Sequence, residues 1–213
     1  MQTRKGQSIE DASMQMIEDE VGDHSYNKKE WPIVRRIIHS TADFDFVDKN
    51  KLLFHKNAVE SGIMALKNGC SIVVDVNGVV GLLNKQNPKD FGNKIVCNIS
   101  EPRIMEIAKG QNKTRSEISM REAKEEIDGG IVAIGNAPTA LLEVIKMVKE
   151  GIVKPALIIG IPVGFICASE SKEELSKLEQ VPFITNVGRK GGSPAAAAII
   201  NALYKLVREE LSP

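Results

Sequence analysis

Residues 182–207, PFITNVGRKGGSPAAAAIINALYKLV, decide the fold of this chain. An apolar, β-branched run at 183–187 passes through a glycine-rich turn at 188–193 into an alanine-rich stretch with helical spacing at 194–211. A buried strand that leads through a tight turn into a long helix is typical of α/β proteins. The same order recurs earlier in the chain, which indicates a repeated strand–helix architecture.

Five short apolar runs have the composition of buried strands. They are residues 71–76, 95–97, 131–134, 156–161 and 183–187. Longer stretches with helical spacing lie at 50–67, 114–127, 138–149, 172–178 and 194–211. Strands that alternate with helices pair in parallel, because a parallel connection needs a crossover. We therefore expect an α/β fold, a three-layer α/β/α sandwich whose mostly parallel sheet has about five strands.

The N-terminal portion, residues 1–68, is predicted to be helical, with apolar residues at helical spacing in 9–21 and 28–38. We expect this segment to pack on the α/β core as a cover or an arm. The sequence has no internal repeat, low-complexity tract or interdomain linker, so a single domain over 1–213 is expected.

Composition excludes several classes of partner. Lys plus Arg and Asp plus Glu both number 28, so no global field favours nucleic acid or an anionic membrane surface. No apolar run approaches the roughly 20 residues that span a bilayer. The three cysteines form no C-x-x-C pair and no signal peptide is evident, so we expect a cytoplasmic protein.

The turn at residues 188–193 resembles an anion-binding site. Ser193 suits an N-cap and Pro194 suits the first helical position, which would place glycine N–H groups beside the positive end of a helix. Arg189 and Lys190 add positive charge there. A capped strand-to-helix turn with two solvated basic residues explains the pattern equally well. The order of residues is not that of a Walker A loop.

Two other turns follow predicted strands. The turn at residues 135–139 combines a tight glycine turn with Pro138 at a helix start, and ligands of open α/β sheets bind at such strand ends. The turn at residues 160–165 is apolar and is expected to shape a wall. For the first of these turns, a plain helix start is an equally simple explanation.

Two further side chains are candidates for chemistry. His39 ends an apolar helical pattern and precedes two hydroxyls and a carboxylate, which could set its tautomer. Arg115 begins a predicted helix and could pair with a carboxylate. A structural histidine and a basic helix end remain open as alternatives.

Metal and nucleotide motifs are missing. Residues 43–48 fail the EF-hand pattern, and neither a zinc motif nor G-x-G-x-x-G occurs, so no metal site is predicted. Residues 171–174 are read as a capping box.

Taken in order, these pieces resemble the precorrin-8X methylmutases, also called precorrin isomerases, over nearly the whole chain. The resemblance rests on Ile9-Glu10 with Ser13, residues 38–43, Val74-Asp75-Val76, Thr114-Arg115-Ser116 and the three turns, and is most specific over 159–201. It implies an isomerase of cobalamin biosynthesis that moves a methyl group from C-11 to C-12 of precorrin-8X or cobalt-precorrin-8, giving hydrogenobyrinate or cobyrinate.

The resemblance also implies roles for residues. His39 corresponds to the catalytic acid/base and Ser13 to a substrate-binding position. The full set of predicted substrate-binding residues is Ser13, Thr41, Arg115, Asn136, Thr139, Gly164, Arg189, Gly191 and Ser193. No cofactor is expected, because any cobalt belongs to the tetrapyrrole substrate. A homodimer is expected, and residues 39–43 look closer to the cobalt-using branch.

Two rival functions remain. One is a non-catalytic protein that binds or chaperones corrinoids through the same anion sites. The other is a phosphate- or nucleotide-dependent α/β enzyme that uses the 188–193 turn.

Overall fold

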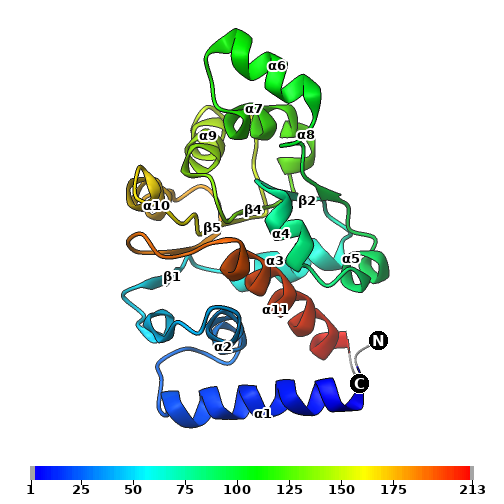
Figure 1. Cartoon of the computed structure of the whole chain (residues 1–213), viewed down its shortest axis with the longest axis vertical. Coiled ribbons are helices and arrows are strands. Elements are labelled where there is room, and N and C mark those ends of the chain that lie inside the picture. The colour runs from blue at the N-terminus through cyan, green and yellow to red at the C-terminus, as the bar shows by residue number, and fades with distance from the viewer. Residues whose placement is uncertain (1–2, 212–213) are drawn as a thin grey trace.

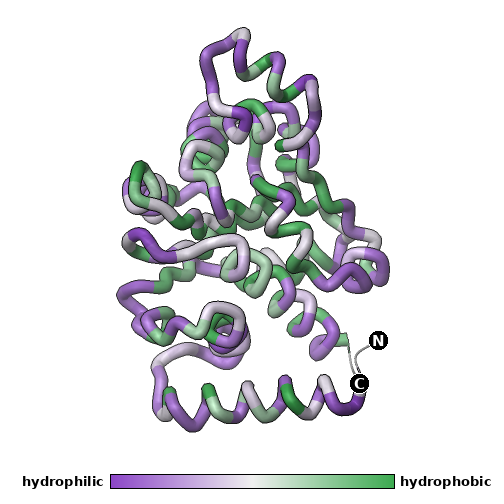
Figure 2. Tube along the Cα trace, in the orientation of Figure 1, coloured by the Kyte–Doolittle hydropathy of each residue, from purple (hydrophilic) through white to green (hydrophobic). Residues whose placement is uncertain are grey.

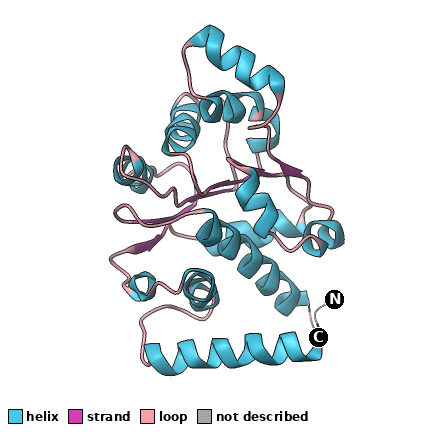
Figure 3. Ribbon diagram, in the orientation of Figure 1, coloured by secondary structure: helices cyan, strands magenta, loops and turns pink. Residues whose placement is uncertain are grey.

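A single twisted sheet runs through the middle of the molecule, with helices on both faces (Figures 1 and 3). The structure is a computed structural model that describes residues 3–211. The strands are β1 (Leu52–Phe54), β2 (Ile72–Val74), β3 (Ile95–Val96), β4 (Ile131–Ile134), β5 (Leu157–Gly160) and β6 (Phe183–Asn186). Their order is β1-β6-β5-β4-β2-β3, and all neighbours are parallel except the β1–β6 pair. The predicted sandwich and mostly parallel sheet are confirmed.

The helices occupy the intervals between and around these strands. They are α1 (Arg4–Val21), α2 (Glu30–Thr41), α3 (Ala58–Lys67), α4 (Asn77–Leu82), α5 (Gln86–Phe91), α6 (Pro102–Gln111), α7 (Arg115–Glu122), α8 (Lys124–Ile127), α9 (Pro138–Lys149), α10 (Ala168–Ser176) and α11 (Ser193–Leu211), with a 3-10 turn at Phe44–Val47.

Alternation along the strands divides the core between the two faces of the sheet. Val132 and Ile134 pack with α7, α9 and α10 on one face, whereas Ile131 and Ala133 pack with α2, α3 and α11 on the other. Successive side chains of a strand point to opposite faces, so a strand buried on both sides is apolar throughout. Figure 2 shows the sheet as a hydrophobic band between more polar helices.

The N-terminal portion differs from the prediction, because it is not all helical. Residues 52–54 form β1, which pairs antiparallel with β6 at the register Leu52↔Asn186. Leu52 is fully buried, and α3 begins only at Ala58, after Asn57 in a left-handed conformation. Apolar residues at 52–54 fit either a short strand or the start of a helix, and pairing with the β6 edge decides between them.

Several boundaries also differ. The predicted helix at 114–127 is broken at Ala123 into α7 and α8, and α10 begins at Ala168 rather than at Lys172. The predicted capping box at 171–174 is therefore wrong: Ser171 lies inside α10, where its hydroxyl donates to the Ala168 carbonyl at 3.1 Å. Helices α4, α5 and α6 were not predicted.

The strand order reverses its direction at one point in the sheet. The chain runs from β2 outward to β3 and then returns to the other side of β2 to form β4. In doubly wound sheets the point where the order reverses is the usual ligand site, at the carboxyl ends of the strands. Here that point lies between β2 and β4.

Candidate functional site

Most of the predicted site residues lie at the carboxyl ends of the parallel strands. The turns that follow β4, β5 and β6 meet the first turn of α11 there. A Cβ added to Gly135 would lie 2.8 Å from the Ser193 Cα, so the helix start packs directly on the backbone after β4. Gly192 donates its N–H to the Ile161 carbonyl at 2.9 Å, which joins the turns after β5 and β6.

A buried carboxylate lies where the strand order reverses, between β2 and β4. Asp75 follows β2, is completely buried, and accepts hydrogen bonds from the backbone N–H groups of Gly135 (3.0 Å), Asn136 (2.7 Å) and Ala137 (2.6 Å). Burial raises the pKa of the Asp75 carboxyl, and the three N–H groups act in the opposite direction. The backbone donors of the 135–139 turn therefore already hold an anion, which belongs to the protein itself.

The side chains of this turn are placed differently from its backbone. Asn136 is exposed, and the Thr139 hydroxyl lies 3.1 Å from the Thr114 hydroxyl. Thr114 caps α7 through a capping box with Glu117. Arg115, the first residue of α7, is exposed beside this pair, so the structure brings Arg115 and Thr139 into one region.

In the 188–193 turn the two basic residues have different surroundings. Lys190 forms ion pairs with Asp43 (2.9 Å) and Asp45 (2.7 Å), so its charge is already matched. Arg189 is exposed, and its guanidinium lies 5.6 Å from the ring centroid of Phe165. Of the two cations, only Arg189 is available to an anionic ligand.

The backbone of this turn is tightly constrained. Gly191 has φ of 147°, and a Cβ there would lie 2.4 Å from the Ile161 carbonyl oxygen, so only glycine fits. Gly164 donates its N–H to the Arg189 carbonyl at 3.2 Å, which brings these two predicted residues together. Helix α11 begins at Ser193, and Gly192 accepts its first helical hydrogen bond, from Ala196. The predicted N-cap is therefore displaced by one residue.

His39 lies in the last turn of α2 and is half-buried. Burial, followed by the nearby positive charge of Arg36, lowers its pKa, while Glu10 acts in the opposite direction. The hydroxyls that follow His39 cap the helix instead of contacting the imidazole. Ser40 donates to the carbonyls of Ile37 (3.0 Å) and Pro194 (3.3 Å), and Thr41 also donates to the Ile37 carbonyl, at 2.8 Å. The Ser40 contact fixes the end of α2 against the start of α11.

Arg36 is a candidate that the sequence analysis missed. It precedes His39 by one helical turn and so shares its face of α2. It forms an ion pair with Glu10 of α1, and Ser13 lies one turn further along α1, where its hydroxyl donates to the Ile9 carbonyl. The i, i+3 spacing of Arg36 and His39 was the signal that could have found it.

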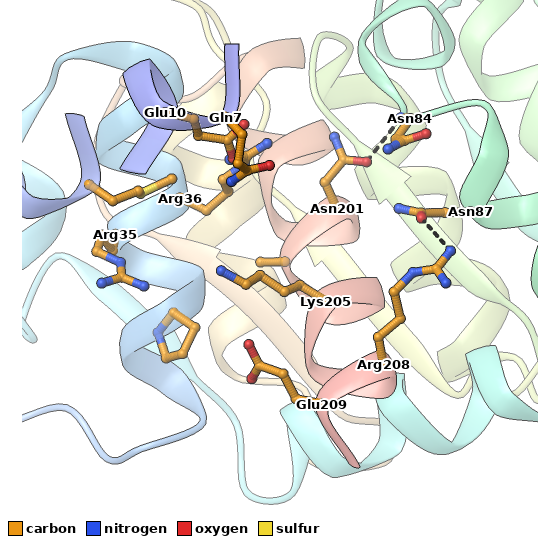
Figure 4. Close-up of a pocket in the computed structure, with 13 residues that line it drawn as sticks. Gln7, Glu10, Arg35, Arg36, Asn84, Asn87, Asn201, Lys205, Arg208 and Glu209 are labelled. Carbon is orange, nitrogen blue, oxygen red and sulfur yellow. Dashed lines mark hydrogen bonds and ion pairs between the residues drawn. The ribbon is translucent and has the colours of Figure 1, made fainter. Parts of the chain in front are cut away.

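A pocket of about 370 Å³ opens beside Arg36 (Figure 4). Figure 4 shows residues of α1 and α2 on one side and residues of α11 on the other. Arg35 and Arg36 are paired with Glu18 and Glu10, whereas Lys205 is exposed. The lining of this pocket does not include His39, which lies one helical turn beyond Arg36 on α2.

Neither a metal-binding cluster nor a membrane-spanning helix occurs in the described part of the chain. Among residues 3–211, no group of three or more His, Cys, Asp or Glu side chains is arranged to hold a metal ion. Within the same described part of the chain, no helix has the length and apolar character to cross a bilayer.

The sequence and the fold of this chain are similar to those of known proteins. A family model described as precorrin-8X methylmutase matches residues 8–206. The chain is 51% identical over 201 residues to the cobalt-precorrin-8 methylmutase of Priestia megaterium, covering 94% of this chain and 88% of that protein. It is 35% identical over 204 residues to the precorrin-8X methylmutase of a Sinorhizobium species, covering 95% of each. A crystal structure of precorrin-8X methylmutase from Thermus thermophilus superposes with a TM-score of 0.85 at 38% identity, covering 95% of this chain and 98% of that one.

Proposed function

The chain belongs to the precorrin-8X methylmutase family, and from this premise we propose how its residues carry out the reaction. The protein is an isomerase of cobalamin biosynthesis that moves a methyl group from C-11 to C-12 of precorrin-8X or cobalt-precorrin-8. The rival of a non-catalytic corrinoid-binding protein is not favoured, because relatives that match over the full chain are named methylmutases.

His39 is the proposed acid/base. A proton or hydrogen bond given by its imidazole to ring C of the tetrapyrrole withdraws electron density while the methyl group migrates, and the imidazole recovers the proton afterwards. The lowered pKa of His39 makes its protonated form a stronger acid. The position of this half-buried histidine, at the junction of α2 and the start of α11, is the observation that carries the proposal.

The carboxylate arms of the substrate require several separated binding points. Arg189 and Arg115 are exposed cations at two different turns of the same sheet edge, which suits widely spaced acetate and propionate groups. Asn136, Thr139 and Ser193 supply neutral donors in the same region. We propose that Ser13 and Thr41 hold the arms near His39, that Arg36 acts by lowering the pKa of His39, and that Gly164 and Gly191 allow close approach of the substrate.

The macrocycle itself needs an apolar surface. Phe165 and Ile166 are 84% and 82% exposed after β5, an unusual exposure for large apolar side chains. We propose that the side chains of Phe165 and Ile166 contact one face of the tetrapyrrole. No cofactor is proposed for the protein itself, and cobalt, when present, is part of the substrate.

The proposed role of His39 is tested by single-turnover conversion of precorrin-8X, followed by absorbance. His39→Ala should slow conversion about 10²-fold or more while product affinity stays close to that of the wild type. His55→Ala is a matched control, because His55 follows β1 and donates its N–H to the Phe183 carbonyl at the amino end of β6, opposite the carboxyl end that carries the 188–193 turn. Unchanged conversion by His39→Ala would remove this residue from the mechanism. Running metal-free and cobalt-loaded substrate side by side identifies the natural one.

We further propose a homodimer in which α1 contacts the partner subunit. Ile9 and Met16 lie two turns apart on α1 and are 59% and 70% exposed, so α1 presents an apolar stripe to solvent. Met16→Glu should then shift the sedimentation coefficient from dimer to monomer. A wild-type protein that sediments as a monomer at working concentration would refute this proposal.

The cytoplasm is the proposed location. Its reducing conditions suit Cys70, Cys97 and Cys167, which are all free thiols in this structure.

A further inference from the structure

Lys172 is a buried cation that the proposed mechanism does not use. It lies on α10 and is only 1% exposed. Its ammonium donates to the Lys190 carbonyl at 2.7 Å and to the Asn186 side-chain oxygen at 3.2 Å. Both acceptors are neutral, and no ion pair of Lys172 occurs among the described residues. Burial without a counter-ion lowers the pKa of Lys172 to about 8.

The contacts of Lys172 fix which side of the 188–193 turn faces inward. The Lys190 carbonyl accepts from Lys172 and also from the Asn186 side-chain amide, at 2.8 Å. The Arg189 carbonyl accepts the Gly164 N–H from the turn after β5. Two successive carbonyl groups of the turn are therefore bonded to the body of the protein.

The orientation of the N–H groups follows from these bonds. In a trans peptide the C=O and N–H point in opposite directions. Because the carbonyls of Arg189 and Lys190 point inward, the N–H groups of Lys190 and Gly191 point away from the protein. None of the hydrogen bonds among residues 3–211 uses either of these two donors. Two backbone N–H groups without a protein acceptor, beside the exposed Arg189 side chain, suit an anion.

The buried side chains behind the two glycine turns carry opposite charges. Behind the 135–139 turn, the Asp75 carboxylate takes up the backbone donors. Behind the 188–193 turn, the Lys172 ammonium takes up a backbone acceptor and leaves donors free. The 188–193 turn therefore offers an anionic arm its backbone N–H groups, whereas the 135–139 turn can offer only its side chains, Asn136 and Thr139.

We propose that Lys172 is a positioning residue for substrate binding, which holds the 188–193 turn with its N–H groups and the Arg189 side chain toward a substrate carboxylate. This inference rests on the proposed function, because it assigns one carboxylate arm of the tetrapyrrole to this turn. Lys172 acts through the turn and through its charge, without touching the substrate.

The test compares Lys172→Met with Ser171→Ala, which removes a neighbouring buried hydroxyl of α10 that does not contact the turn. The affinity for hydrogenobyrinate and the single-turnover rate are measured for each variant. Lys172→Met should weaken binding about 10-fold, with the rate at saturating substrate within about 3-fold of the wild type. In a double-mutant cycle with Arg189→Ala, the two losses should be less than additive, since both act on one carboxylate.

The pH dependence of the wild-type protein gives a second readout that needs no variant to fold. Product affinity should fall as the pH rises through about 8, where Lys172 loses its charge. The charged groups on the neighbouring elements are Glu173 on α10, Arg189, and Lys190 with its ion-pair partners Asp43 and Asp45.

The outcomes separate the two proposals. A wild-type protein that neither binds nor converts the tetrapyrrole would refute the proposed function. A protein that converts it, with affinity independent of pH between 7 and 9 and unchanged in Lys172→Met, would refute the role of Lys172 alone. If Lys172→Met does not fold, Lys172→Gln and the wild-type pH titration decide.

Discussion

Replacing Asp75 by asparagine should destabilise the protein by about 3 kcal/mol. The amide oxygen can keep the two bonds to Asn136 and Ala137, but its NH₂ group then faces the Gly135 N–H, a second donor. An unpaired buried N–H costs about 1–3 kcal/mol, and two bonds that lose their charge weaken by about 1 kcal/mol each. Relief from burying a charge offsets part of this sum.

Thermal unfolding followed by circular dichroism measures this effect, with an expected drop in Tm of about 6–12 °C for a chain of this length. Asp128→Asn is the matched control, because Asp128 is exposed and accepts a single backbone N–H, from Lys154 at 2.7 Å. The control should change stability by less than about 1 kcal/mol. Equal stability of Asp75→Asn and the wild type would show that the three N–H bonds do not hold the turn.

Three further predictions concern charge. Arg36→Gln removes a positive charge near His39, so the pKa of His39 should rise, which a histidine NMR titration measures; a fall would contradict the assigned cause. The pKa of Lys172 is about 8 in the folded protein and lower than in the unfolded chain. Between pH 8 and 10.5 the unfolded state therefore binds more protons than the folded state. The free energy of unfolding should rise with pH over this range, by at most about 3 kcal/mol relative to Lys172→Met. Denaturation curves at both pH values test this, and parallel curves for the two proteins would refute it. Arg189→Ala should weaken product binding more at low salt than at high salt, as seen by titration, because screening already erodes exposed contacts; an equal loss at both would indicate packing damage.

Most of the sheet could be predicted from sequence, because strands buried on both faces are continuous apolar runs. β1 could not, since three residues carry too little periodicity to separate a strand from a helix start. Its partner β6 lies more than 100 residues later, and only that pairing defines it. Local pattern therefore predicts the interior strands and fails at an edge defined by a distant segment.

The site shows the same division. Arg189 and Gly191 lie in a turn whose composition alone marks it, and the turn is where it was expected. The functions of Asp75 and Lys172 depend on which backbone groups they meet in space. A carboxylate between two valines of a buried run and a lysine in a helix are ambiguous until the turns behind them are placed.

The hydrogen bond between Ser40 and Pro194 joins residues 154 positions apart in the chain. Its consequence concerns biosynthesis of the protein. A chain emerging from the ribosome completes α2 long before α11 exists, so the apolar face of α2 has no final partner during most of translation. Closing so long a loop slows folding relative to a fold of local contacts. A truncated chain that lacks α11 should be inactive, because His39 reaches its position only after the last helix has been synthesised and has completed the core on its face of the sheet.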